Sequence, residues 1–514
     1  MKWKINLNDS VYIVAEKTDA GVTISGYPKG IEELIISRVR GNKVYFALED
    51  RLFACVNMNE ESVYYLRKEP FTTTDIRNAF ANSRQQHLIQ EVTFYSENNR
   101  EFKEERTTPE VTIKTELHTH FLEMLTGREF LDLMGEFTKY VPVKDGIIPG
   151  KLQKGEFLED FSKEDISYAR GLSDTDVEKI PYTLLCSQLS IDVSGQVPFE
   201  TMEETSTRRT NVITIAAREL AKTLGMDPLD FQKVAECRAI IYIKMLEKSL
   251  KTLKDHDIEY VEFSYSTKNT IIKMMEYIRK HPEKFSGIDF NILFSFSRNV
   301  KKASGVEKSL VAFKDLVDQS YVKGFDLMGQ ENGLTFGDIT DLNDQRSFIS
   351  IIKKVLEIMD GREDLVLRLH AGENYNSRNN PLESLRVIDK LYEEMKCCKT
   401  LPQIRLGHGL HFAETYTEEE LAEYADLLQR YKVIVEINAT SNFTLSNITN
   451  LQRLPYRWYV ANKIPIVLAT DGAGMYLTDA IQEKMLANIF GGEGTLDNVL
   501  NTENGVLRRW CYGF

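Results

Sequence analysis

The sequence predicts an α/β chain whose main part is a (β/α)8 TIM barrel, with a large helical insertion after the first strand and a small β-rich N-terminal domain. Eight short apolar runs, typical of buried parallel strands, recur after residue 110, and amphipathic helical stretches lie between most of them. Residues that bind metals or transfer protons follow several of these runs. Active sites of TIM barrels lie at the C-terminal ends of the strands, so this placement also favours the barrel.

The predicted strands and helices alternate along the chain. The eight strands are expected at residues 111–118, 259–265, 290–296, 324–328, 365–370, 403–408, 433–438 and 465–470. The clearest amphipathic helices are expected at residues 269–280, 345–359, 381–394 and 418–430. We assign this barrel domain to residues 109–514.

Residues 1–108 are predicted to form a separate, small β-rich domain. Short alternating patterns, separated by turn residues, occur at residues 10–16, 21–26, 43–48 and 51–57. Residues 96–109, dominated by Glu, Asn, Lys, Arg and Thr, are typical of a solvated linker. Three roles are open for this domain: it binds a ligand, it covers the active site, or it forms a homo-oligomer or binds another partner.

The insertion between the first two barrel strands, about residues 121–258, is far longer than an ordinary crossover. Helices are expected there at residues 128–140, 174–180, 212–224 and about 230–253. Residues 187–210 are polar and rich in Ser, Thr and Glu, which predicts a mobile lid over the site.

Three histidines and one aspartate form a candidate metal site. His118 and His120 are two residues apart, so on a strand both side chains face the same side and can share one ion. His370 and Asp471 close two further apolar runs, whose C-terminal ends meet at one face of a barrel. Three imidazoles and one carboxylate suit zinc, which activates water near neutral pH when a coordination position stays open. The sequence therefore predicts one Zn²⁺ ion per chain.

Glu373 and His408 also lie at the ends of predicted strands. Because neither belongs to the four candidate metal ligands, we expect both to transfer protons. With the metal residues, they lie in five short segments: His-Thr-His at 118–120, His-Ala-Gly-Glu at 370–373, Gly-His-Gly at 407–409, Thr-Ser-Asn at 440–442 and Thr-Asp-Gly at 470–472. Together these segments resemble the adenosine and AMP deaminase family, a branch of the metal-dependent amidohydrolase superfamily. The resemblance covers roughly residues 110–490 and is to divergent bacterial members with an extra N-terminal domain.

The resemblance implies a role for each residue of the site. The zinc ligands that it implies are His118, His120, His370 and Asp471. Glu373 corresponds to the acid that donates a proton to the purine ring nitrogen next to the reacting carbon, and His408 to the base that orients and deprotonates the zinc-bound water. Gly329 corresponds to a residue whose backbone amide contacts the purine. The implied catalytic residues are thus Glu373, His408 and Asp471.

The reaction implied by the resemblance is hydrolytic deamination of an adenine nucleoside or nucleotide to the inosine compound, with release of ammonia. Glu373 must then be protonated when substrate binds, and burial beside an aromatic ring favours the neutral carboxyl form. An extra domain with a divergent pocket also resembles bacterial deaminases that alter nucleotide pools during phage infection. That likeness implies a role in antiphage defence.

Three positions depart from the family pattern and bear on substrate binding and stability. Leu122 stands where adenosine deaminases usually carry an acidic residue that bonds the 5′-hydroxyl, so an obstacle to a 5′-phosphate is absent, and Glu123 is a candidate substitute. Gly472 stands where the family has a second aspartate that contacts the purine, so base recognition is expected to differ. Ser264, two residues after Glu262, replaces a common arginine, so a structural ion pair is expected to be missing.

A bound phosphate group would need a cation, and arginine matches phosphate geometry well. Arg378, five residues after Glu373, is the best-placed candidate for this contact. The other arginines expected near the mouth of the barrel are Arg128, Arg208, Arg209 and Arg298.

Composition narrows the possible partners and compartment. The net charge of −13 argues against duplex DNA or RNA, because phosphate backbones require a basic surface. No apolar stretch approaches 18 residues and residues 1–10 lack a signal core, so we expect neither a membrane span nor secretion, and a cytoplasmic location. The six cysteines show no zinc-ligand spacing and fit a reducing compartment.

Two other classes of protein stay open. Another barrel metal hydrolase, such as a two-metal amidase or phosphoesterase, would generally need a bridging lysine or extra ligands at the middle strands, whereas the fourth strand ends in Leu327, Met328 and Gly329. A non-catalytic nucleotide-binding regulator of the same fold would not need the complete set of metal and proton-transfer residues.

Overall fold

The computed structural model describes most of the chain from residue 114 onward, and the backbone of nine strands before residue 106. After residue 114, the undescribed residues are 139–140, 142, 144–146, 151–181, 192–196, 199, 299, 301, 332–339, 375–376, 411, 413–414, 449 and 510–514. The chain divides into two compact units, one of Met1–Thr112 with Asp192–Gln196, the other of Ile113–Ile191 with Val197–Phe514.

Eight parallel strands of the second unit form a nearly closed barrel, which confirms the predicted fold class. The strands, neighbours in chain order, are β10 (Thr115–His120), β11 (Tyr260–Tyr265), β12 (Asp289–Ser297), β13 (Gly324–Met328), β14 (Val366–Ala371), β15 (Gln403–His408), β16 (Ile434–Ile437) and β17 (Ile466–Leu468). The first and last strands meet just beyond β17, where the Asp471 N–H donates to the His118 carbonyl at 2.8 Å and the His120 N–H donates to the Asp471 carbonyl at 3.0 Å.

Two strand boundaries differ from the prediction at this closure. Strand β10 runs to His120 rather than ending at His118, because its last residues form the bridge to Asp471. Residues 111–113 of the predicted first strand lie outside the described residues. Strand β17 is only three residues long, and its chain reaches β10 through the backbone of Asp471. Two metal-site segments therefore close the barrel.

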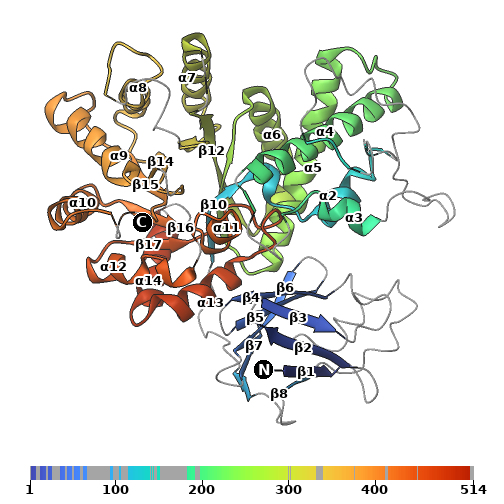
Figure 1. Cartoon of the computed structure of the whole chain (residues 1–514). Coiled ribbons are helices and arrows are strands. Elements are labelled where there is room, and N and C mark those ends of the chain that lie inside the picture. The colour runs from blue at the N-terminus through green and yellow to red at the C-terminus, as the bar shows by residue number, and fades with distance from the viewer. Residues whose placement is uncertain are drawn as a thin grey trace. The chain divides into compact units, whose positions relative to one another are not determined.

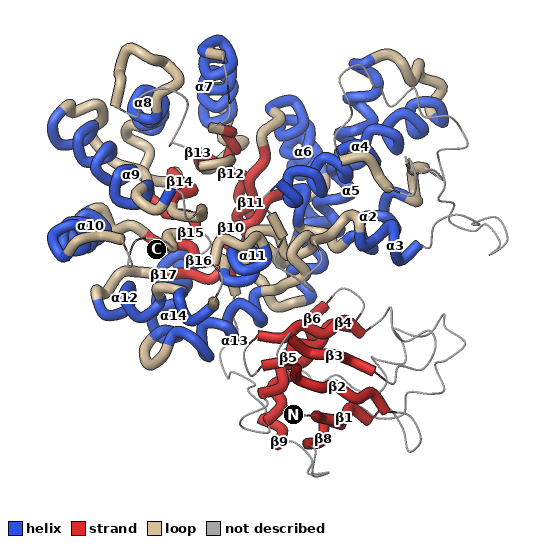
Figure 2. Tube along the Cα trace, viewed as in Figure 1, coloured by secondary structure: helices blue, strands red, loops and turns tan. Residues whose placement is uncertain are grey.

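Helices surround the strands of the barrel (Figures 1 and 2). They are α6 (Lys268–Lys280), α7 (Ala303–Asp318), α8 (Phe348–Met359), α9 (Asn380–Asp389), α10 (Glu418–Arg430), α11 (Ala439–Thr444), α12 (Tyr456–Ala461), α13 (Ala480–Gly491) and α14 (Thr495–Leu507). Helix α8 begins later than predicted because the Ser347 hydroxyl caps its N-terminus by accepting from the Ser350 N–H. Helix α10 starts as predicted, with a reciprocal capping box between Thr417 and Glu420.

The insertion after β10 is helical, but one part of it differs from the prediction. Its elements are the 3-10 turn η2 (Phe121–Glu123) and the helices α2 (Gly127–Met134), α3 (Tyr182–Ser187), α4 (Glu200–Thr223) and α5 (Phe231–Asp255). The second half of the predicted lid at residues 187–210 forms the first half of α4, and its mobility stays a prediction. Hydroxyls such as Thr207 and Thr210 donate to carbonyls one turn back, so these polar residues are accommodated within the helix. The predicted helix at 174–180 lies outside the described residues.

The apolar core lies largely between the strands and the surrounding helices, whereas charged side chains fill part of the barrel interior. Among the largest fully buried side chains are Arg368 on β14 and Arg405 on β15. Their acidic partners come from β11, β13 and β16. This buried polar layer lies directly beneath the candidate site described below.

The first unit contains two sheets. One has the strand order β3 (Gly21–Ser25), β2 (Tyr12–Thr18), β1 (Lys2–Asn6), β8 (Thr93–Ser96), and all its pairs are antiparallel. The other has the order β4 (Ile35–Arg40), β5 (Lys43–Leu48), β6 (Arg51–Asn57), β7 (Ser62–Tyr65), β9 (Lys103–Glu105), with a parallel pair between β7 and β9. Strand β9 lies inside the predicted linker, so part of that stretch is paired. Within the described residues, no helix combines the length and apolar character needed to cross a bilayer.

Candidate metal and active site

Three imidazole rings and one carboxylate meet at the C-terminal end of the barrel. The Nε2 atom of His118 lies 3.1 Å from Nε2 of His370 and 3.4 Å from Oδ1 of Asp471. The Nε2 atom of His120 lies 3.3 Å from the same Asp471 oxygen and 3.4 Å from Nε2 of His370. The structure thus brings together, within 4.8 Å of one another, the ligand atoms of all four residues predicted to hold a metal.

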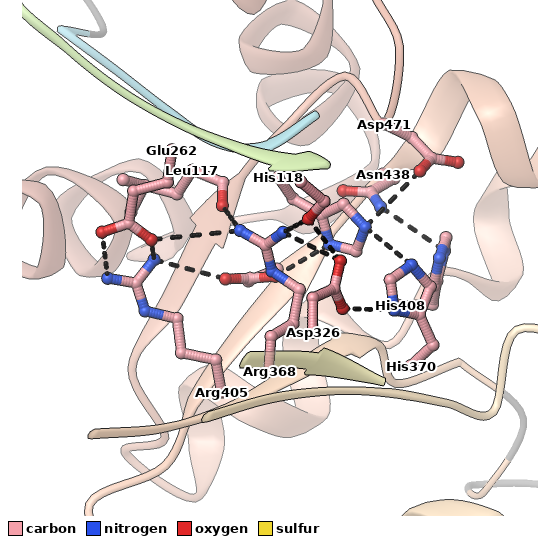
Figure 3. A network of polar contacts seen from close by, with 12 residues as sticks. Leu117, His118, Glu262, Asp326, Arg368, His370, Arg405, His408, Asn438 and Asp471 are labelled. Carbon is pink, nitrogen blue, oxygen red and sulfur yellow. Dashed lines mark hydrogen bonds and ion pairs between the residues drawn. The ribbon is translucent and has the colours of Figure 1, made fainter. Parts of the chain in front are cut away.

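The other ring nitrogens of two histidines face buried carboxylates (Figure 3). Nδ1 of His118 lies 2.8 Å from Oε2 of Glu436 on β16, and Nδ1 of His370 lies 3.0 Å from Oδ1 of Asp326 on β13. A carboxylate beside Nδ1 keeps the proton on that nitrogen and leaves the Nε2 lone pair facing the cluster. Histidines held in this way are typical of metal ligands.

Burial and mutual contacts shift the pKa values of the residues in the cluster. Burial raises the pKa of Asp471, but the contact with His120 and the nearby imidazoles outweigh burial, so the pKa stays well below its usual range. Burial lowers the pKa of His120, yet the Asp471 carboxylate outweighs burial and raises that pKa to about 9. Burial, with the positive charge of Arg368, holds the pKa of His118 well below its usual value.

The residues of the cluster fit a metal ion. The Nε2 atoms of His118 and His370 lie 3.1 Å apart. If the proton of each ring is on Nδ1, two lone pairs face each other here with no proton between them. A shared cation would turn this repulsion into attraction and would neutralise the Asp471 carboxylate. The described residues therefore provide a possible His/Asp metal site.

A buried network of charges supports this cluster from inside the barrel (Figure 3). Arg405 donates two hydrogen bonds to Glu262, at 2.7 and 3.0 Å, and the Arg368 guanidinium lies 2.9 Å from Glu436. Arg368 also donates to the Ser264 hydroxyl at 2.9 Å. The expectation of a missing ion pair at Ser264 is therefore wrong, because Arg405 and Arg368 from later strands supply the positive charge beside Glu262.

Glu373 is buried next to the cluster, and its backbone is held by a second glutamate. Glu331 accepts the Gly372 and Glu373 N–H groups through its two carboxylate oxygens, each at 2.9 Å, and the Asn380 amide at 2.8 Å. Burial, followed by the negative charge of Asp471, raises the pKa of Glu373 to about 8. Glu373 is thus largely protonated at neutral pH and can serve as an acid.

His408 is oriented by an asparagine from α11. Its Nδ1 atom lies 3.1 Å from Oδ1 of Asn442, whose amide nitrogen donates to the Asn438 carbonyl at 2.6 Å. The Nδ1 proton is therefore directed to Asn442, and Nε2 faces the Glu373 carboxyl at 3.7 Å. Burial lowers the pKa of His408, so the ring is neutral and Nε2 can accept a proton.

The backbone at the ends of two strands is in an unusual conformation. His408 and Asp471 have φ values of 69° and 66°, in the left-handed region that side chains other than glycine rarely occupy. Such strain persists only where surrounding contacts impose it, and it is concentrated at functional sites. Here it turns both side chains toward the cluster at the end of the barrel.

A cavity of about 320 Å³ opens beside these residues. Its lining includes His120, His370, Glu373, His408 and Asp471. One face of α4 lines the opposite part, through Met202, Glu203, Ser206, Thr207 and Thr210. The residues of this face recur at the spacing of helical turns, so the polar pattern that predicted a lid belongs to a wall of the pocket.

Of the residues predicted to bind substrate, Gly329 lines the cavity, whereas Leu122 and Gly472 do not. Gly329, with φ of 100°, lines the cavity, as the prediction requires. Leu122 does not line it; its carbonyl accepts from Arg209 at 2.7 Å and its side chain packs against the core. The neighbouring Glu123 lines the cavity instead. Gly472 is also absent from the lining, and the space beside its α-carbon is taken by Glu123.

The arginines predicted near the mouth do not line the described pocket. The backbone carbonyl of Arg378 accepts a hydrogen bond from the Tyr416 hydroxyl at 3.1 Å. Arg209 is fully buried and donates to the Leu189 and Leu122 carbonyls, and Arg298 donates to the Leu327 and His370 carbonyls. Arg208 donates to the Ile148 carbonyl at 3.1 Å. These contacts hold backbone segments.

Sequence reasoning missed four supporting residues: Asp326, Glu331, Glu436 and the orienting function of Asn442. A signal was present for two of them, since Asp326 and Glu436 are acidic residues in the middle of otherwise apolar strands. Glu331 and Asn442 lie just beyond strand ends, and only the folded chain shows which neighbour they contact.

The fold and the site define a (β/α)8 barrel protein with a possible metal centre at the C-terminal ends of its strands. Residues 236–497 match the family model described as adenosine deaminase, and the chain belongs to the adenosine deaminase family. This result confirms the family that the five short segments indicated. The matched residues do not include β10, so His118 and His120 lie outside them.

Two curated relatives are adenosine deaminases. The protein from Enterococcus faecalis is 27% identical over 209 residues, which cover 40% of this chain and 50% of the relative. The protein from Plasmodium gallinaceum is 28% identical over 134 residues, or 26% of this chain and 32% of the relative. The chain thus spans half or less of the length of these relatives. Among solved structures, adenine deaminase from Arthrobacter aurescens has a TM-score of 0.43 and 14% identity, covering 76% of this chain and 94% of that one.

Proposed function

We propose that the protein catalyses hydrolytic deamination of an adenine compound, releasing ammonia and leaving a hypoxanthine ring. The observation that carries this proposal is the pairing of a buried acid, Glu373, with a neutral imidazole, His408, beside the histidine and aspartate cluster. Membership of the adenosine deaminase family supports the same reaction.

The metal would be held by His118, His120, His370 and Asp471, and we propose that it is one zinc ion per chain. Imidazole nitrogens with one carboxylate oxygen are a donor set that zinc accepts. When bound, the ion would lower the pKa of a water molecule and so supply a nucleophile at neutral pH. The carboxylates of Glu436 and Asp326 would keep the ligand rings in the required tautomer.

His408 and Glu373 would carry out the proton transfers. Nε2 of His408 accepts the proton of the attacking water, because Nδ1 is already committed to Asn442. The protonated carboxyl of Glu373 donates to the ring nitrogen beside the reacting carbon, which makes that carbon more electrophilic. The N–H bonds from Gly372 and Glu373 to Glu331 fix the position from which this proton is delivered.

The test is an assay of the full chain loaded with zinc. Adenosine, deoxyadenosine, adenine and AMP are each incubated with the protein, and the ultraviolet change from adenine to hypoxanthine is followed together with ammonia release. Turnover of at least one compound, abolished by a chelator and restored by zinc, is the expected result. No turnover of any of them by correctly folded, zinc-containing protein would overturn the proposal. The antiphage role and the cytoplasmic location implied by the sequence stay predictions.

A further inference from the structure

A second cavity, of about 520 Å³, opens at the end of the barrel opposite the candidate active site. Its lining includes Gln403, the first residue of β15, Ile434, the first residue of β16, and Pro465, just before β17. His408 is the last residue of β15, so about 16 Å of strand separates the two sites. The facing wall is helix α14, which packs beside α12 and β17 (Figure 1). A small molecule bound here would be separated from the proposed catalytic residues by the barrel interior.

The lining of this cavity is positively charged. Its described residues include Lys432, Lys463 and Arg509 but neither aspartate nor glutamate, although the whole chain has a net charge of −13. Lys432 lies in the turn before β16 and Lys463 in the turn before β17, so two successive turns each bring an ammonium group to the same cavity. Neither lysine forms an ion pair with any residue that the structure describes. Both ammonium groups are therefore available to an anion.

Hydrogen bonds hold the third cation and one wall of the cavity in place. The Gln403 side chain donates to the Lys432 carbonyl at 3.0 Å, and its Oε1 atom accepts from the Arg509 guanidinium at 3.1 Å. Asn498, on α14, accepts from the Ile466 N–H at 3.0 Å and so ties the helix to β17. A site whose groups are already ordered loses less conformational entropy when a ligand binds.

Helix α14 leaves open space at the cavity. Gly505 lies inside this helix, where glycine is less favourable than alanine, and a Cβ atom added to it would meet no other atom within 4 Å. Asn501, one turn earlier on the same face, also lines the cavity, and its amide has no partner among the described residues. The wall thus combines unfilled volume with an available hydrogen-bond donor.

These groups match the chemistry of a phosphate. Ammonium and guanidinium groups form charge-assisted hydrogen bonds with phosphate oxygens, and an amide N–H adds an uncharged donor. The volume is within the range of small-molecule pockets, about 300–1,000 Å³. The apolar part of the lining provides a surface for an uncharged portion of the ligand, through Ile434, Val460, Pro465 and Val506.

We propose that the cavity between α14 and the N-terminal ends of β15, β16 and β17 is a second binding site, for a small molecule that carries a phosphate group. Lys432 and Lys463 bind the phosphate oxygens, and Arg509, held by Gln403, provides the third positive charge. This inference goes beyond the proposed deaminase function, because the site lies away from the metal cluster and its occupancy is measured without turnover.

The test is calorimetric titration of the full chain with pyrophosphate, ATP and adenosine, in the parent and in Lys432→Gln, Lys463→Gln and Lys396→Gln. Lys396 is the matched control: it too has a left-handed φ, of 50°, but it pairs with Glu393 at 3.0 Å and does not line the cavity. We expect pyrophosphate and ATP to bind, and each of the first two variants to weaken their binding about tenfold through loss of one charged hydrogen bond. Lys396→Gln should leave it unchanged, and none of the variants should alter binding of adenosine.

Gly505→Leu is a second variant that fills the cavity and leaves every charge in place. It should weaken binding of both phosphate compounds, and circular dichroism shows that it is folded. Tighter binding of ATP than of pyrophosphate would identify a nucleotide as the source of the phosphate, whereas equal binding would identify the phosphate group alone. Absence of binding, or affinities in Lys432→Gln and Lys463→Gln equal to that of the parent, would overturn the proposed site. Failure of the deaminase assay would leave these results unaffected.

Discussion

The Nδ1 atom of His118 lies 2.8 Å from Oε2 of Glu436, and both side chains are completely buried inside the barrel. The same Glu436 oxygen lies 2.9 Å from the guanidinium of Arg368. Burial raises the pKa of Glu436 to about 7, although Arg368 and Arg405 oppose that rise. Glu436 therefore links the charged interior of the barrel to the orientation of a candidate metal ligand.

Replacement of Glu436 should weaken metal binding without removing any of the four candidate ligands. In Glu436→Gln the charge that holds the Nδ1 proton of His118 is lost, so zinc affinity should fall about 10- to 100-fold. Competition with a chromophoric chelator measures this affinity. The control is Glu423→Gln, because Glu423 is partly exposed and bonds Arg386 at 2.6 Å on the surface. Equal affinities in both variants would contradict the role assigned to Glu436.

Replacement of Glu373 should separate metal binding from catalysis. Glu373→Gln keeps the size of the side chain but removes its acidic proton, so kcat should fall about 10²- to 10⁴-fold while the zinc content stays that of the parent. Metal analysis and steady-state kinetics are measured on the same preparation. Glu383→Gln, on α9, is a control outside the pocket. Retained kcat, or loss of zinc together with kcat, would argue against an acid role for Glu373.

The buried pair of Arg405 and Glu262 should stabilise the barrel only as a pair. Arg405→Met leaves Glu262 buried without its two hydrogen bonds, so the free energy of unfolding should fall by about 3–5 kcal/mol. The double variant Arg405→Met with Glu262→Met removes the uncompensated charge and should recover part of that loss. Urea unfolding followed by circular dichroism measures both. A double variant that is less stable than the parent by the full sum of the effects of Arg405→Met and Glu262→Met alone would refute the pairing.

The fold and the cluster were readable from the sequence because they depend on regular patterns. Apolar runs alternating with amphipathic helices predict a barrel, and residues at strand ends such as His370 and Asp471 are then expected at one face. The parts that escaped prediction depend on which strands are neighbours. Arg368 on β14 contacts Ser264 on β11 and Glu436 on β16 because all three side chains lie in the barrel interior. These residues are far apart in the chain.

The conformation of the chain just after β10 explains why Glu123, rather than Leu122, lines the pocket. The chain leaves β10 through the 3-10 turn η2, and in such a turn side chains three residues apart lie above one another. Glu123 therefore follows the direction of His120 into the cavity, whereas Leu122 turns to the core. An extended continuation of the strand would instead have placed residue 122 on the same side as His120.

Glu503 should make the stability of the barrel depend on pH. On α14, its Oε1 atom accepts from the Thr115 N–H at 3.0 Å, the Thr115 hydroxyl at 2.7 Å and the Lys114 N–H at 3.2 Å, which ties this helix to the start of β10. Burial raises the pKa of Glu503 from 4.5 to about 7. Because the folded protein prefers the neutral form, this contribution is fully present below pH 4.5 and is lost as the pH rises through about 7.

Glu503→Gln stays neutral at every pH, so it should become more stable relative to the parent as the pH rises. The difference in free energy of unfolding between variant and parent should shift in favour of the variant by about 2–3 kcal/mol between pH 4.5 and pH 8. Urea unfolding at the two pH values measures it, with Glu493→Gln, an exposed residue just before the same helix, as the control. A difference that is the same at both pH values would mean that Glu503 is already ionised in the folded barrel, held by its three donors.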